Sequence, residues 1–86
     1  MKLIIFTNEE SPEKRESLEI GQILEDEGYN VEYLDWVSED AETKAHIFDI
    51  YKTPAFLIVN EDGSMIEMWQ GEIPTAANIK HLLAHD

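Results

Sequence analysis

Few side chains in this sequence can take part in chemistry. None of its 86 residues is cysteine, which excludes disulfides, thiolate nucleophiles and thiolate metal ligands. His81 and His85 are four residues apart and could share a helix face, but no carboxylate triad lies nearby, so we expect a solvated helix end. No Gly-rich phosphate loop, Ser-His-Asp set or paired-carboxylate pattern occurs. We therefore expect no metal, no cofactor and no thiol–disulfide oxidoreductase activity, and we favour a protein that is not an enzyme.

Ser11 stands directly before Pro12, at the start of a helical pattern. A serine hydroxyl is barely ionised near neutral pH, so it cannot replace a thiolate in disulfide exchange. Its oxygen can instead accept hydrogen bonds from the free amide groups of a helix start, and proline suits the first helical position. We therefore interpret Ser11 as a helix N-cap, with Glu13 and Glu16 near the positive end of the helix dipole.

The first half of the chain reads as strand, helix and strand. Residues 3–6 are all apolar, as in a central strand that is covered on both faces. The helix that follows has an apolar stripe formed by Leu18, Ile20, Ile23 and Leu24, and Gly28 can end it in a left-handed conformation. Residues 30–36 are rich in β-forming side chains. A strand, helix and strand of these lengths predict a parallel crossover.

The second half predicts helix, hairpin and helix. Ser38 or Asp40 can cap a helix that runs to about Ile50 and ends before Thr53, because the residue before a proline disfavours helical geometry. Its expected buried face is Ala41, Ala45, Phe48 and Ile50 or Tyr51. Pro54 opens an apolar strand that reverses at Asp62-Gly63 into residues 65–70. Gly71 breaks that strand, and a last helix starts at Pro74 or Thr75 with Ile79, Leu82 and Leu83 inward.

The predicted order is βαβαββα, one α/β domain over residues 1–86 with a central, mixed four-stranded sheet flanked by helices. Met65 and Met68 are expected in the core. Trp36 and Trp69 lie at strand ends, where we expect sheet packing, although either aromatic ring could anchor a partner.

The order of elements and the residues around Pro54 resemble the thioredoxin and glutaredoxin superfamily. In that superfamily a helix is followed by a cis-proline, two antiparallel strands, a glycine and a last helix, and Pro54 and Gly71 match this pattern. Phe48 and Ile50 stand where thioredoxins have an aromatic and an aliphatic residue before the proline. Where a glutaredoxin has Cys-Pro-Tyr-Cys, this chain has Ser11-Pro12-Glu13-Lys14. The chain thus resembles a cysteine-less, redox-inactive member.

The resemblance implies a binding surface that does not need the cysteines. In the superfamily the backbone beside the cis-proline pairs with an extended peptide, which requires no particular side chain, and Thr53 would offer that backbone here. A purely structural proline at a strand entrance is an open alternative. The expected binding residues are Ser11, Pro12, Glu13, Lys14, Arg15, Thr53, Pro54 and Gly71. We expect a protein- or peptide-binding module.

Two other functions remain open. Nineteen acidic and six basic residues give a net charge of −13, which repels nucleic acids and anionic membranes but suits an acidic inhibitor or nucleic-acid mimic that binds a basic partner protein. The resemblance also leaves open a glutathione-dependent enzyme, in which Ser11 donates a hydrogen bond to the thiol of glutathione, as in a related domain of some glutathione transferases. Glutathione is an anionic peptide, however, and Glu9, Glu10 and Glu13 would repel it.

The sequence shows no signal peptide and no membrane span. We expect a cytoplasmic monomer that does not contact membranes or nucleic acid directly.

Overall fold

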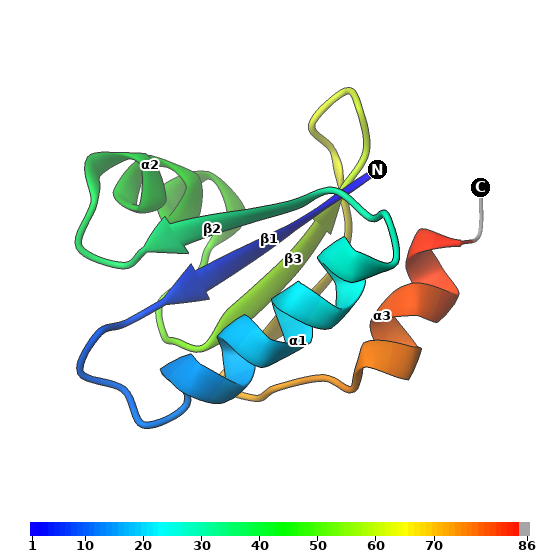
Figure 1. The fold of residues 1–86 in the computed structure, drawn as a ribbon. Coiled ribbons are helices and arrows are strands. Elements are labelled where there is room, and N and C mark those ends of the chain that lie inside the picture. The colour runs from blue at the N-terminus through cyan, green and yellow to red at the C-terminus, as the bar shows by residue number, and fades with distance from the viewer. Residues whose placement is uncertain (85–86) are drawn as a thin grey trace.

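Three helices and four strands make up the chain in a computed structural model, which describes residues 1–84 (Figure 1). In chain order the elements are β1 (Lys2–Thr7), α1 (Lys14–Asp26), β2 (Val31–Asp35), α2 (Glu39–Phe48), β3 (Ala55–Val59), β4 (Met65–Gln70) and α3 (Ala76–Leu83). The predicted order βαβαββα is confirmed.

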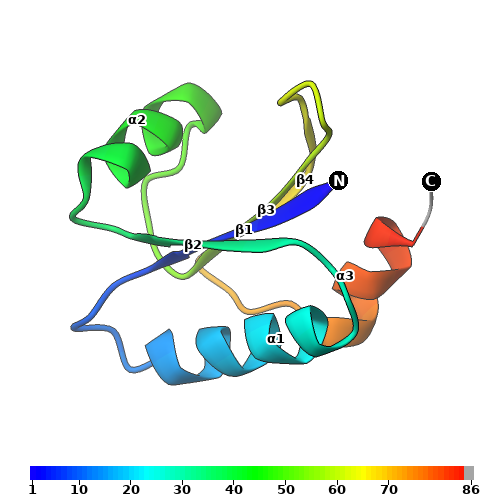
Figure 2. The same cartoon turned by 45° about the horizontal axis from the view of Figure 1, so that its top comes forward.

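The four strands form one mixed sheet in the order β2-β1-β3-β4. β1 pairs with β2 in parallel and with β3 antiparallel, and β4 is added antiparallel to β3. Figure 2 shows α2 on one face of this sheet and α1 with α3 on the other. The central strands β1 and β3 are therefore covered on both faces, as the apolar run at residues 3–6 predicts.

Alternating residues of β1 supply the two halves of the core. Ile4 and Phe6 belong to the cluster under α2, whereas Leu3 and Ile5 belong to the cluster under α1 and α3. The helices complete these clusters with Ala41 and Ala45 from α2, Leu24 from α1, and Ile79 and Leu83 from α3. Trp36 and Trp69 are partly buried and pack against the two clusters, as expected for strand-end aromatic residues.

One expectation for α1 is wrong and another holds only in part: of the expected apolar stripe, Leu24 is buried and Ile20 packs against the core. The helix begins at Lys14 with Glu13 at the cap position, so Pro12 lies outside it; Ser11 still accepts a hydrogen bond from the Glu13 N–H (3.2 Å) in the turn before the helix. The buried face consists of Ser17, Gly21 and Leu24, while Leu18 and Ile23 are 37% and 46% exposed. Small residues face the sheet because the helix approaches it closely, and an apolar stripe alone does not reveal that face.

Gly21 of α1 lies directly over Tyr33 of β2. A Cβ atom at Gly21 would come within 2.5 Å of the Tyr33 hydroxyl oxygen and 2.9 Å of Ile5 Cδ1. Tyr33 thus packs its ring in the space that the missing side chain leaves. Burial, and to a lesser degree the hydrogen bond and negative charge of Glu25, raises the pKa of Tyr33 to about 12.

We expect Tyr33 to ionise late in an alkaline titration. Because its folded-state pKa is raised, its contribution to stability is complete below the ordinary pKa of 10.0 and is lost as the pH rises toward about 12. The test is the ultraviolet tyrosinate titration of the wild type minus that of Tyr33→Phe, with folding monitored by circular dichroism. A difference curve centred near 10 would contradict the packing of the Tyr33 hydroxyl against Gly21.

The hairpin and the second helix differ in detail from expectation. An Asp-Gly turn of the expected kind has a positive φ at both residues. Here the reversal spans residues 60–64, and Gly63 has a positive φ (+89°) whereas Asp62 does not. Met65 is 48% exposed because β4 is an edge strand, so its expected core position is wrong; Met68 packs against the core. Tyr51 is also exposed, whereas Ile50 is buried.

Helix ends elsewhere follow the sequence signals. Ser38 accepts a hydrogen bond from the Ala41 N–H and Thr75 from the Asn78 N–H, which caps α2 and α3. His81 lies in α3, while His85, the other half of the expected pair, lies outside the described residues. Within residues 1–84 no cluster of three or more potential metal ligands occurs. No helix in the same range is long and apolar enough to cross a membrane.

Candidate functional site

The strand register gathers most of the expected binding residues at one end of the sheet. Phe6 pairs with Ala55, and Ala55 pairs with Gln70. The loop after β1, the Thr53-Pro54 segment before β3 and Gly71 after β4 must therefore leave the sheet at the same end. The loop after β2 joins them there, because Phe6 also pairs with Leu34. Figure 1 shows these connections opposite the end that carries the N-terminus and the β3–β4 reversal.

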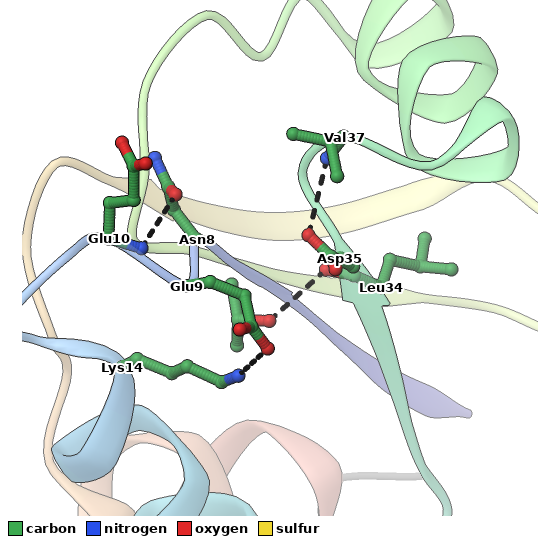
Figure 3. Close-up of polar contacts among 8 residues, drawn as sticks. Asn8, Glu9, Glu10, Lys14, Leu34, Asp35 and Val37 are labelled. Atoms are coloured by element: carbon green, nitrogen blue, oxygen red, sulfur yellow. Dashed lines mark hydrogen bonds and ion pairs between the residues drawn. The ribbon is translucent and has the colours of Figure 1, made fainter.

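The loop between β1 and α1 is held by its own polar groups. The Glu10 N–H donates to Asn8 Oδ1 (3.1 Å), and Lys14 Nζ forms an ion pair with Glu9 Oε1 (2.5 Å), as Figure 3 shows. The hydrogen bond and the charge of Lys14 hold the pKa of Glu9 below its usual value. In the loop after β2, the Val37 N–H donates to Asp35 Oδ1 (3.3 Å).

Ser11 has both of its hydrogen-bonding functions engaged within this loop. Its hydroxyl donates to the Glu13 carboxylate and accepts from the Glu13 N–H. The hydroxyl hydrogen bond, followed by a backbone hydrogen bond, lowers the pKa of Glu13. A hydroxyl used in this way does not point to a role in holding a thiol, so the geometry favours the local, turn-forming role.

A shallow hollow of about 550 Å³ lies along the first turns of α1. Ser11, Pro12, Lys14 and Arg15 line it, together with Leu18, Glu19 and Gln22. Four of the expected binding residues thus share one surface, whereas Glu13, Thr53, Pro54 and Gly71 do not line this hollow.

The Thr53-Pro54 segment carries an unpaired piece of backbone. The peptide bond between the two residues is cis. The Pro54 carbonyl accepts a hydrogen bond from the Gly71 N–H (2.8 Å), which ties the start of β3 to the end of β4. Among the described residues, neither the N–H nor the carbonyl of Thr53 has a hydrogen-bond partner. Thr53 itself is half-buried, and Pro54 after it is buried.

Gly71 has a positive φ (+79°) and lies against Lys52. A Cβ atom at Gly71 would come within 2.5 Å of Lys52 Cε. We expect Gly71→Ala to destabilise the fold by about 1–2 kcal/mol, the usual penalty of a left-handed conformation, plus a smaller amount because Lys52 must move.

Urea unfolding measures the free energy that Gly71→Ala costs. Gly63→Ala is the matched control, because Gly63 also has a positive φ but open space around it. In a Lys52→Ala background the two substitutions should have equal effects. An effect of Gly71→Ala smaller than that of Gly63→Ala in the wild-type background would contradict the contact.

Five of the six basic side chains are ion-paired in residues 1–84. The pairs are Lys2 and Lys44 with Glu32, Lys14 with Glu9, Arg15 with Glu19, and Lys80 with Glu27. Each is at least partly exposed, so each stabilises the fold by no more than about 1 kcal/mol. Their main consequence is electrostatic, because among the lysines and arginines of residues 1–84 they leave Lys52 alone without a carboxylate partner.

Sequence reasoning missed a second hollow near this end of the sheet. It measures about 430 Å³ and lies where α2 ends, lined by Trp36, Ala45, Ile50 and Tyr51 and by the polar residues Glu42, His46 and Asp49. The sequence indicated Trp36 as a residue that could anchor a partner, since aromatic residues dominate interface hot spots. It gave no such indication for Tyr51, because the 75% exposure of that residue depends on how the chain leaves α2.

Comparison with known proteins agrees with this architecture. No family model matches the sequence, and no curated protein is significantly similar to it. An uncharacterised thioredoxin-like protein from Clostridium perfringens has a similar structure, with a TM-score of 0.82 and 20% identity over 96% of this chain and 68% of that one. Thioredoxin 1 from Thermosipho africanus TCF52B gives a TM-score of 0.76 and 16% identity over 98% and 96% of the two chains. The C-terminal domain of Neisseria meningitidis DsbD gives 0.66 and 15% identity over 98% and 79%.

The chain therefore has the thioredoxin-like fold, with a four-stranded mixed sheet and three helices. Within that class it lacks cysteine altogether. A thioredoxin-like fold without cysteine fits a redox-inactive domain, because thiol–disulfide exchange requires a thiolate.

Proposed function

We propose that this chain is a redox-inactive binding module that pairs the backbone of Thr53 with an extended segment of a partner protein. The observation that carries the proposal is that the N–H and carbonyl of Thr53, a half-buried residue, have no hydrogen-bond partner in the part of the chain that the structure describes. Unpaired backbone groups next to a strand are a template for β-augmentation, in which main-chain hydrogen bonds provide affinity.

The surroundings of Thr53 support an ordered template. On one side the Gly71 N–H fixes the Pro54 carbonyl. On the other side the Tyr51 N–H donates to Gln70 Oε1 (2.9 Å), and Gln70 Nε2 donates to the Asp49 carbonyl (3.2 Å). The loop is thus attached to β4 before and after Thr53. A loop held in this way loses little conformational entropy when a peptide binds, which favours affinity.

A second candidate is an acidic inhibitor or nucleic-acid mimic that binds a basic protein through scattered carboxylates. The ion pairs favour this candidate, since the net charge is −13 and five of the six lysines and arginines already have carboxylate partners. This candidate depends on long-range charge, whereas strand pairing depends on short-range hydrogen bonds.

Salt concentration separates the two candidates. Partners would be captured from a lysate of the source cell with the immobilised chain at about 0.05 M and about 0.5 M salt, where the Debye length falls from roughly 14 Å to roughly 4 Å. Strand pairing predicts a partner that is retained at both concentrations. A partner that the higher salt releases, and that a Thr53 backbone variant binds equally well, would overturn the proposal in favour of the acidic surface.

A further inference from the structure

The hollow at the end of α2 has apolar walls that are not fully covered. Three of its lining residues are apolar or aromatic and differ in burial: Ala45 and Ile50 are only 8% and 5% exposed, whereas Tyr51 is 75% exposed. Trp36 packs edge-on against Phe6, with the ring centroids 6.3 Å apart and an interplanar angle of 76°. Aromatic side chains that stay partly exposed beside buried aliphatic ones are typical of pockets that receive an apolar anchor from a partner.

The chain that forms this hollow is held in place before any ligand binds. Asp49 ends α2 in a left-handed conformation (φ 58°), which directs the following residues away from the helix. The two hydrogen bonds of Gln70, to the Asp49 carbonyl and from the Tyr51 N–H, attach this segment to β4. The hollow is therefore formed by an ordered loop and two core residues.

Two carboxylates and one imidazole, that of His46, line the hollow. Glu42 and Asp49 line it, and no lysine or arginine does. Neither carboxylate accepts a hydrogen bond from a described residue, whereas Lys44 of the same helix is paired with Glu32. A basic group that approached would thus meet two carboxylates with free acceptor sites, which favours cationic partners and disfavours acidic ones.

We infer that this hollow receives an aromatic or long aliphatic side chain of the partner segment, and that a lysine or arginine two residues away, on the same face of that extended segment, meets Glu42 and Asp49. The inference rests on the proposed function, because Tyr51 lies two residues before Thr53 and alternate side chains of a paired segment are about 7 Å apart. It adds the chemistry of the partner: an extended segment with an apolar residue flanked by basic ones.

The test uses the isotope-labelled chain and three synthetic heptapeptides, called Lys-Phe-Lys, Lys-Ala-Lys and Glu-Phe-Glu after their residues at positions 2, 4 and 6, with serine at positions 3 and 5, so that the three named side chains share one face of an extended peptide. Binding is followed by the NMR shifts of the backbone amides and of the Trp36 indole. We expect the Lys-Phe-Lys peptide to shift the Ala45, Ile50 and Tyr51 amides and to bind at least tenfold more tightly than either of the others. Tyr51→Ala should lower this affinity at least fivefold, whereas the control Ile23→Ala, which removes a 46% exposed residue of α1, should leave it unchanged.

Glu42→Gln tests the charge, with Glu61→Gln as its control, since Glu61 lies at the opposite end of the sheet in the β3–β4 reversal. Only Glu42→Gln should lower the affinity for the Lys-Phe-Lys peptide. Equal affinities for the Lys-Ala-Lys and Lys-Phe-Lys peptides would overturn the inference, and so would NMR shifts spread over all acidic segments. Self-association of the chain through this hollow would also overturn it. Shifts at Thr53 without shifts at the hollow would overturn it while leaving the proposed function standing. Shifts at the hollow that survive Thr53→Pro would support the hollow and overturn the strand pairing.

Discussion

Replacing Thr53 by proline is expected to lower the affinity for the partner segment by roughly tenfold to a hundredfold. The substitution removes one N–H donor and leaves a carbonyl of the bound segment without its hydrogen bond. Such an unsatisfied group costs about 1–3 kcal/mol when it is buried in an interface. The expected loss is large because the proposed interaction consists of few main-chain bonds, and Thr53 supplies the free pair.

Thr53→Ala is the matched control for this experiment. It removes the side chain but keeps the amide, so backbone pairing predicts affinity close to that of the wild type. Circular dichroism and urea unfolding establish that both variants are folded. A complementary experiment modifies the bound segment instead of the protein. Its backbone nitrogens are methylated one at a time, and strand pairing predicts that only methylation at every second position abolishes binding. Equal binding by Thr53→Pro and Thr53→Ala, with both folded, would contradict the pairing.

Replacing Phe6 by alanine is expected to remove about 3–5 kcal/mol from the free energy of unfolding. Phe6 is fully buried in β1, which pairs with both β2 and β3, and its ring supports Trp36. A chain of this size has a total stability of roughly 4–13 kcal/mol, so the substitution would leave a marginal fold. The midpoint of thermal unfolding should fall by more than about 12 °C.

Ile47→Ala serves as the control for Phe6→Ala, because Ile47 is 65% exposed on α2. Its effect should remain within about 0.5 kcal/mol. Thermal and urea unfolding of the three chains measure both effects. A loss below about 1.5 kcal/mol for Phe6→Ala would mean that the cavity under Trp36 collapses readily, and that the Phe6 ring is not what supports Trp36 at the hollow.

Much of the fold could be predicted because its signals are local. Pro54 marks the entrance of β3, Gly63 and Gly71 bound β4, and Ser38 and Thr75 cap their helices. These residues act through their own backbone preferences, which neighbouring elements do not override.

The buried face of α1 and the exposure of Met65 could not be predicted in the same way. Gly21 faces the sheet where Tyr33 occupies the space between helix and strand, a contact that joins residues far apart in sequence. Met65 is exposed because β4 lies at the edge of the sheet, and the order of strands is a tertiary property.

The candidate site divides along the same line. Thr53 was singled out through the resemblance around Pro54, and its binding role stays a prediction, whereas the hollow beside Tyr51 depends on the hydrogen bond from the Tyr51 N–H to Gln70, 19 residues further along the chain. No local pattern indicates that bond. The loop around Ser11 was placed correctly before α1, but the helix start shifted to Lys14 because the Ser11–Glu13 contacts form a separate turn.

The most direct test of the proposed function is the hydrogen-exchange rate of the Thr53 amide, measured by NMR with and without a captured partner segment. The free chain should exchange this amide quickly, because it has no partner among residues 1–84. Strand pairing predicts that the segment slows its exchange by at least tenfold, while the Gly63 amide in the distant reversal is unaffected. Unchanged exchange at Thr53 in a saturated complex would contradict the account.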